Sequence, residues 1–155
     1  MEQKSSRNFD LLTLGQVLLR LSPPDNERLS RGDTFVKQVG GAELNVAVGA
    51  SLLGLHTGVI SKLPAHDIGS FMKGKIRSFG VSDDFFMYDH STSARLGIYY
   101  YENGAYPRKP KVIYDRNNSS FFSLDINEIP QEVYTASKCF HTTGITLALS
   151  EQVRE

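Results

Sequence analysis

The chain has 155 residues, of which 40% are hydrophobic and 22% are charged, so it can build a core and does not have the composition of a disordered chain. Lysine plus arginine and aspartate plus glutamate both total 17, so no basic excess points to nucleic acid or to an anionic membrane surface. The single cysteine, Cys139, excludes an internal disulfide framework. No segment approaches the ~20 apolar residues of a membrane span and "MEQKSSRNFD" has no apolar signal-peptide core, so we expect a cytoplasmic protein.

The first forty residues predict strands. An apolar run over 9–14 ends at a glycine and suits a buried strand. The alternation over 17–21 predicts a second, less buried strand. Two prolines followed by Asp25 and Asn26 then predict a turn, after which 33–39 returns as a strand.

The next fifty residues alternate between helix and strand. Residues 44–55 have helical spacing and are apolar on most sides, which predicts a buried helix stopped by Gly54. A short strand follows around 59–60. A second helix is expected from Asp67, as N-cap, to Gly80, and a strand follows in "VSDDFFMY", with Asp83–Asp84 as a solvated turn. This order predicts an α/β fold with a parallel sheet and right-handed crossovers.

Two tyrosine-rich segments interrupt this pattern. "ARLGIYYYE" and "KVIYDRN" have strong β preference, and we expect them to form a small separate sheet with the early strands near Val17 and Phe35. The main pattern then resumes with a short helix after Pro130 and the strand "SKCFHTTG", in which Cys139 is predicted to be a core residue. "TLALSEQVRE" has the pattern of a further helix.

The pair Gly40–Gly41 stands directly before the predicted buried helix. Free backbone N–H groups and the positive end of the helix dipole gather at such a place, and glycine lets a ligand approach the backbone closely. The spacing is neither G-x-G-x-x-G nor a P-loop. A tight turn and a binding corner for a hydroxylated or anionic small molecule both remain open.

Tyr99 and Tyr101 are two residues apart on a predicted strand and therefore share a face. Together with Tyr114 and Arg116 they offer apolar rings, hydroxyls and a planar guanidinium, which would suit a sugar acid. Cross-strand contact that merely stabilises a small sheet is the alternative. The four histidines are scattered without metal-ligand spacing, so no metal site is expected.

Five motifs together resemble the N-terminal half of the ribokinase-like (PfkB-type) carbohydrate kinases, and within them the 2-keto-3-deoxygluconate kinases. They are "LGQVLLRLSPP", "VGGAELNVAVGASLLG", "GIYYYENG", "VIYDRNNS" and "HTTGITLALS". The resemblance implies a parallel sheet with a small β-sheet lid over 16–38 and 93–118. It also implies ATP and Mg²⁺ as cofactors of the complete enzyme and a small sugar acid as substrate. Gly40, Gly41, Tyr99, Tyr114 and Arg116 are the substrate-binding residues it implies.

The sequence departs from this family in two places. Gln16 stands where the family often has glutamate, which leaves a role for that position in doubt. The family's Gly-Ala-Gly-Asp motif, which carries the catalytic base and the anion hole, occurs nowhere in the sequence, so residues 1–155 are expected to be a partial domain without the nucleotide-binding half. We therefore expect no catalytic residue in this chain and no activity of the chain alone.

Two alternatives to this function remain. One is a kinase for another sugar, such as fructose or an inositol-derived acid, and the other is a non-catalytic sugar-binding module. An incomplete parallel sheet would expose a strand edge and apolar surface, so we expect marginal stability or self-association. A homodimer through the lid or that edge is one form that such self-association would take.

Overall fold

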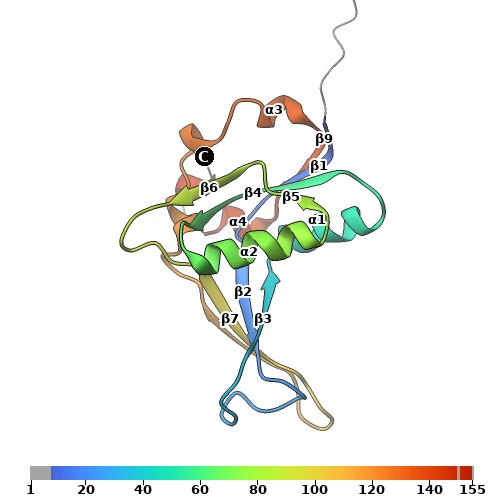
Figure 1. The fold of residues 1–155 in the computed structure, drawn as a ribbon, viewed down its shortest axis with the longest axis vertical. Coiled ribbons are helices and arrows are strands. Elements are labelled where there is room, and N and C mark those ends of the chain that lie inside the picture. Colours follow the sequence, from blue (N-terminus) through green and yellow to red (C-terminus); the bar gives the residue numbers. More distant parts are fainter. Residues whose placement is uncertain (1–7, 150, 155) are drawn as a thin grey trace, which may run out of the picture.

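The computed structural model describes residues 8–149 and 151–154. Figure 1 shows two sheets that meet near the middle of the molecule, with the smaller sheet projecting away from the larger. The larger, parallel sheet consists of β1 (Phe9–Leu14), β4 (Thr57–Pro64), β5 (Val81–Ser82), β6 (Phe86–Asp89) and β9 (Ser137–His141). Its order is β5-β4-β1-β9, and β6 also pairs with β4 in parallel.

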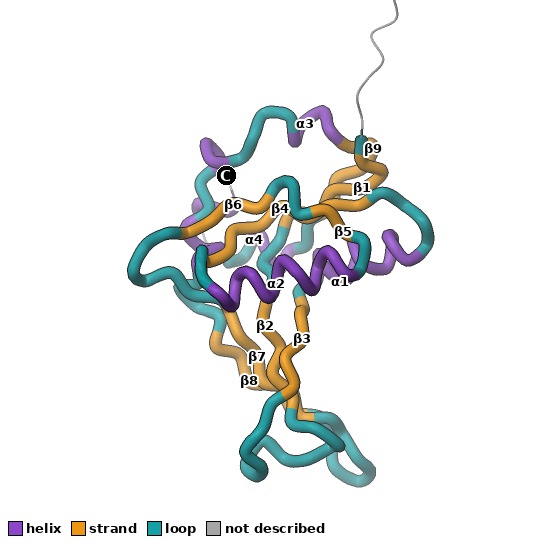
Figure 2. The backbone as a smooth tube through the Cα atoms, in the orientation of Figure 1, coloured by secondary structure: helices purple, strands orange, loops and turns teal. Residues whose placement is uncertain are grey.

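The small sheet is built from two pairs of strands that are far apart in the sequence. Its strands are β2 (Leu18–Ser22), β3 (Val36–Gly40), β7 (Gly97–Glu102) and β8 (Lys111–Asp115). The order is β3-β2-β7-β8, with antiparallel hairpins β2–β3 and β7–β8 joined by a parallel β2–β7 pair. Figure 2 shows these strands leading away from the parallel sheet into long loops. The expected α/β class with an additional small β-sheet is confirmed.

Helices cover both faces of the parallel sheet. They are α1 (Ala42–Leu52), α2 (Asp67–Ser78), α3 (Val133–Ala136), α4 (Gly144–Leu147) and α5 (Glu151–Arg154), with 3₁₀ turns η1 (Ser120–Ser123) and η2 (Ile126–Glu128). The larger core cluster packs α1 and α2 against one face, with Leu44, Leu63 and Met72 almost fully buried. The other face packs against α3 and the 3₁₀ turns. No helix among the described residues is long and apolar enough to cross a bilayer.

The prediction that the first helix is buried all round is wrong. Only one side of α1 faces the sheet, through Leu44 and Ala47, whereas Leu52 and Leu53 are 74% and 85% exposed. Helical periodicity cannot reveal this, because an apolar residue on every side gives no stripe that identifies the buried side.

Three local predictions also need correction. The N-cap of α2 is His66, whose Nδ1 accepts a hydrogen bond from the Ile68 amide at 3.2 Å, and Asp67 is the first helical residue. Cys139 is exposed, because β9 is an edge strand among the described residues. Asp83 is buried rather than solvated, because Arg77 and Lys73 of α2 pair with its carboxylate at 2.6 and 3.2 Å.

The terminal segment forms two short helices, α4 and α5, where one helix was expected over 146–155. Residues 150 and 155 of that prediction lie outside the described residues.

Candidate functional site

A cavity of about 460 Å³ lies where the small sheet meets the start of α1, and we call it the inter-sheet cavity. This volume is in the range of small-molecule sites. Its lining combines arginines, tyrosines, amide side chains and the first turn of α1: Gln16, Leu18, Arg20, Gly41, Ala42, Glu43, Asn45, Tyr99, Tyr101, Val112, Tyr114, Arg116 and Ile145. Four of the five predicted substrate-binding residues therefore line one cavity. Gly40, the fifth, does not line it but lies against the Tyr99 side chain, which does.

Gly40 and Gly41 exclude a side chain for different structural reasons. Gly41 is the N-cap of α1 and has φ +143°, a conformation that side chains rarely adopt. A Cβ at Gly41 would also lie 2.7 Å from the Gln16 carbonyl oxygen. At Gly40 the space is taken by Tyr99, whose Cε1 would lie 2.9 Å from an added Cβ and whose hydroxyl would lie closer still.

The tyrosines form one wall of the inter-sheet cavity. Tyr99 and Tyr114 are cross-strand partners on β7 and β8, with ring centroids 5.8 Å apart. Tyr101 lies two residues further along β7, and the guanidinium carbon of Arg20 stacks 4.3 Å from its ring centroid. Burial raises the pKa of Tyr99, so its phenol stays protonated and can donate a hydrogen bond at neutral pH.

Arg116 lies immediately after β8 at the end of this wall. Its Nε donates to Gln16 Oε1 at 2.8 Å, and its guanidinium carbon lies 5.8 Å from the Tyr114 ring centroid. Burial lowers the pKa of Arg116, against the opposing influence of Tyr114 and Glu43, but arginine remains charged. Within the described part of the chain, its terminal nitrogens have no hydrogen-bond acceptor.

Glu43 joins the first turn of α1 to the segment after β9. The carboxylate is almost fully buried, and its Oε1 accepts hydrogen bonds from Thr143 N at 3.1 Å, Thr143 Oγ1 at 2.5 Å and Thr146 Oγ1 at 2.6 Å. Gly15 makes room for this carboxylate, because a Cβ there would overlap it. These bonds fix the segment that carries Ile145 against the inter-sheet cavity.

Sequence reasoning assigned no role to several lining residues. Asn45 lies one helical turn after Gly41, and that i, i+4 spacing is a signal that could have placed it on the cavity side. Gln16 contacts Arg116 across 100 residues, and no local pattern predicts such a contact.

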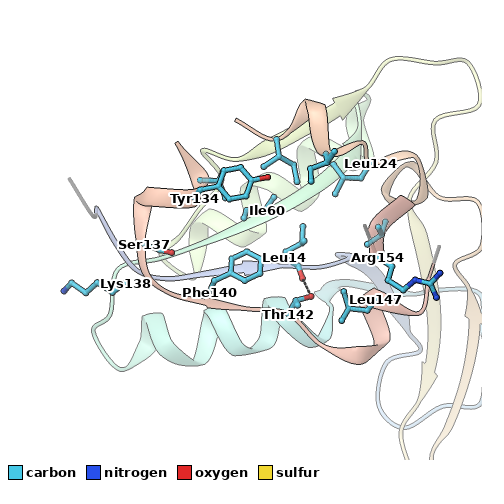
Figure 3. A pocket seen from close by; sticks show the side chains of 14 residues that line it. Leu14, Ile60, Leu124, Tyr134, Ser137, Lys138, Phe140, Thr142, Leu147 and Arg154 are labelled. Atoms are coloured by element: carbon cyan, nitrogen blue, oxygen red, sulfur yellow. Dashed lines mark hydrogen bonds between the residues drawn. The ribbon is translucent and has the colours of Figure 1, made fainter. Parts of the chain in front are cut away.

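A second hollow of about 450 Å³ lies on the other face of the parallel sheet. Figure 3 shows Leu14 and Ile60 along its sheet side, with Tyr134 and Phe140 facing one another across it. Its lining is mainly apolar, and the Thr142 hydroxyl is committed to the Leu14 carbonyl at 2.9 Å. Without converging polar groups, this hollow lacks the means to orient a sugar.

No site for Mg²⁺ is evident in 8–149 and 151–154. No group of three or more His, Cys, Asp or Glu side chains there is placed to hold a metal ion. The inter-sheet cavity contributes one carboxylate, Glu43, and its Oε1 already accepts three hydrogen bonds. The described residues therefore do not fit a magnesium site.

The chain matches known proteins along almost its whole length. The model of the pfkB family carbohydrate kinases matches residues 8–155. A 2-dehydro-3-deoxygalactonokinase of Haloferax volcanii is 38% identical over 146 residues, covering 94% of this chain and 45% of the relative. A 5-dehydro-2-deoxygluconokinase 1 of Bacillus cereus is 31% identical over 148 residues, covering 95% and 44%.

Solved structures agree with the sequence relatives. The crystal structure of a 2-dehydro-3-deoxygluconokinase from Thermotoga maritima superposes with a TM-score of 0.87 at 36% identity, covering 94% of this chain and 44% of that protein. The chain thus spans less than half the length of the relatives it matches. Since the family model covers nearly all of its residues, the chain belongs to the pfkB family of carbohydrate kinases.

Proposed function

We propose that this chain supplies the sugar-binding half of a kinase that transfers the γ-phosphate of ATP to a hydroxyl of a sugar acid. The proposed substrate is 2-keto-3-deoxygluconate. Gly40, Gly41, Tyr99, Tyr114 and Arg116 form its binding site, and the small sheet acts as the lid.

The observation that carries this proposal is the state of Arg116. Its guanidinium is partly buried on a cavity wall, yet the described residues offer no acceptor for its terminal nitrogens. The terminal nitrogens are therefore available to a ligand, and a carboxylate that reaches both would form charge-assisted hydrogen bonds in partly desolvated surroundings, where such bonds are stronger than in bulk water. A sugar acid of the size that the inter-sheet cavity admits brings such a carboxylate.

The remaining walls suit the hydroxyl groups of a sugar. The first turn of α1 directs free backbone N–H groups toward this end of the cavity, where Gly41 adds no side chain. The protonated Tyr99 phenol offers a further donor opposite. The sugar would therefore lie between the helix terminus and the tyrosine wall, and closure of the small sheet would exclude water.

We assign no catalytic base, metal ligand or nucleotide contact to this chain. Phosphoryl transfer requires the phosphates, the metal and the attacking hydroxyl to be positioned together, and ATP with Mg²⁺ would supply the first two in the complete enzyme. The residues named here bind and orient the sugar and exclude water. The chain alone is therefore expected to bind sugar without phosphorylating it.

Other substrates remain candidates through the relatives' names. The Haloferax volcanii and Bacillus cereus relatives are named as kinases of different dehydro-deoxy sugars. Arg116 supports an acidic substrate in each case but does not distinguish the epimers or the position of the keto group.

A calorimetric titration with 2-keto-3-deoxygluconate tests the proposal, with the parent protein compared to Arg116→Ala. Hydrogen bonds to charged groups contribute ~1.5–3 kcal/mol, so the variant should bind about 10- to 100-fold more weakly. Arg95→Ala is the matched control, because the Arg95 guanidinium is already paired with Asp115 at 2.8 Å and does not line the cavity. The control should bind like the parent.

Two results would reject the proposal. One is an absence of binding by the parent protein at millimolar sugar. The other is equal affinity of the parent and Arg116→Ala, since the arginine would then not contact the ligand.

We further propose a cytoplasmic homodimer joined through strand edges. The residues of β8, an edge strand of the small sheet, are all exposed, and among the described residues β9 is an edge strand of the parallel sheet. Sedimentation equilibrium should show a dimer, and a monomer at every concentration up to about 100 μM, a range in which weak complexes form, would contradict this.

A further inference from the structure

Gln16 is a buried polar side chain at the junction of the two sheets. It follows the end of β1 and is 3% exposed, while its amide reaches the inter-sheet cavity. Burying an amide is costly unless its oxygen and nitrogen are both hydrogen-bonded. Its contacts therefore show what the position is built to hold.

Both ends of the Gln16 amide are committed. Oε1 accepts from Arg116 Nε at 2.8 Å, and Nε2 donates to Ser119 Oγ at 2.6 Å and to the Arg116 carbonyl oxygen at 3.4 Å. Exchanging the oxygen and nitrogen would set the amide donor against the arginine donor, so one orientation is fixed. Gln16 thus contacts both the side chain and the main chain of Arg116.

The surrounding packing leaves room for this contact and little more. Gly97, the first residue of β7, lies beneath it, and a Cβ there would be 2.9 Å from Gln16 Nε2 and 3.3 Å from Arg116 Cβ. A side chain at Gly97 would therefore separate the pair. The small sheet brings together two residues that are 100 positions apart.

An arginine can bind a carboxylate in two bidentate ways, through Nε and one terminal nitrogen or through both terminal nitrogens. At Arg116 the first way is closed, because Nε donates to Gln16. The uncharged amide closes it without neutralising the guanidinium. Only the end formed by the two terminal nitrogens remains for a ligand.

We propose that Gln16 is a positioning residue that makes the site selective for acidic sugars. It holds Arg116 so that the two terminal nitrogens face the cavity and take the carboxylate end-on. This inference rests on the proposed function. It assigns a role to a position whose role the sequence alone leaves in doubt.

The test compares 2-keto-3-deoxygluconate with its methyl ester, which removes the negative charge of the carboxylate and adds one methyl group. Gln16→Met removes the amide at similar volume, which frees an arginine whose rotamers must then be ordered on binding. Its affinity for the acid should fall about 10-fold, while its affinity for the ester should stay within about twofold of the parent. Gln16→Asn is a second variant that keeps an amide but is one methylene too short to reach Nε, and it should give the same result.

A double-mutant cycle separates positioning from general damage to the fold. In the Arg116→Ala background, Gln16→Met should change the affinity for the acid no further, because Gln16 acts through the arginine. Three results would each overturn the inference. The first is a further loss of acid affinity when Gln16→Met is added to Arg116→Ala, and the second is an equal loss of affinity for the acid and the ester. The third is an acid affinity of both Gln16 variants that matches the parent.

The same titrations distinguish the two proposals. If Arg116→Ala loses acid affinity and the Gln16 variants do not, only the role of Gln16 is wrong. If Arg116→Ala also binds like the parent, the proposed function fails, and the role of Gln16 fails with it.

Discussion

Replacing Gly41 by alanine should destabilise the fold through the backbone alone. The residue has φ +143°, where a side chain is strained, and the added Cβ would lie 2.7 Å from the Gln16 carbonyl oxygen, a backbone atom that cannot rotate away. Such strain costs about 1–3 kcal/mol. For a chain of this length, that corresponds to a fall in melting temperature of about 2–12 °C.

Gly49 provides a matched control on the same helix. It is an exposed residue of α1, and a Cβ there would meet nothing within 4 Å. Gly49→Ala should therefore raise stability by about 0.5–1 kcal/mol, because alanine loses less backbone entropy in a helix.

Urea unfolding followed by circular dichroism, with thermal melts of the same samples, measures both variants. The midpoint should fall for Gly41→Ala and rise slightly for Gly49→Ala. If Gly41→Ala is as stable as the parent, or if both variants lose the same amount of stability, the proposed backbone strain at residue 41 is refuted.

Three further predictions concern side chains. Gly40→Ala should displace the Tyr99 ring and weaken sugar binding several-fold in a titration, and unchanged affinity would count against a role for that ring. Burial raises the pKa of Asp83, but the hydrogen bonds from Arg77 and Lys73 hold it below its usual value. The stability that these pairs add is present above about pH 4 and is lost as the pH falls through the folded-state pKa, so the cost of Asp83→Asn should be full at pH 7 and should shrink progressively as the pH falls below about 4, measured by urea titration. Cys139 of the folded 155-residue chain should react with a maleimide at close to the rate of a free thiol, whereas protection would mean that β9 is covered.

Local patterns in the sequence predicted most of the architecture. The alternation of apolar runs with helical stripes gives the strand–helix order of the parallel sheet, and period-two reasoning correctly puts Tyr99 and Tyr101 on one side of β7. These features depend on residues a few positions apart. They are therefore readable without knowledge of the tertiary structure.

Features set by distant contacts were missed or predicted wrongly. Cys139 lies in an apolar run, yet an edge strand leaves it exposed. Asp83 follows α2 in the sequence, but its burial depends on the end of that helix turning Arg77 toward it. Gln16 and Arg116 meet because β7 pairs with β2 on one side and with β8 on the other, and the β2–β7 pairing is not encoded by any local spacing.

Gly41 alone separates β3 from α1, so the link between the small sheet and the helical layer is one residue long. This link passes beside the connection from β1 to β2. A Cβ at Gly41 would lie 2.7 Å from the Gln16 carbonyl oxygen and 3.5 Å from the Val17 Cα. A tilt of one sheet relative to the other would change the backbone at this crossing, together with the two later connections over 90–96 and 116–119. Gln16 and Gly41 both line the inter-sheet cavity, so a ligand that contacted both would link its binding free energy to the tilt of the two sheets.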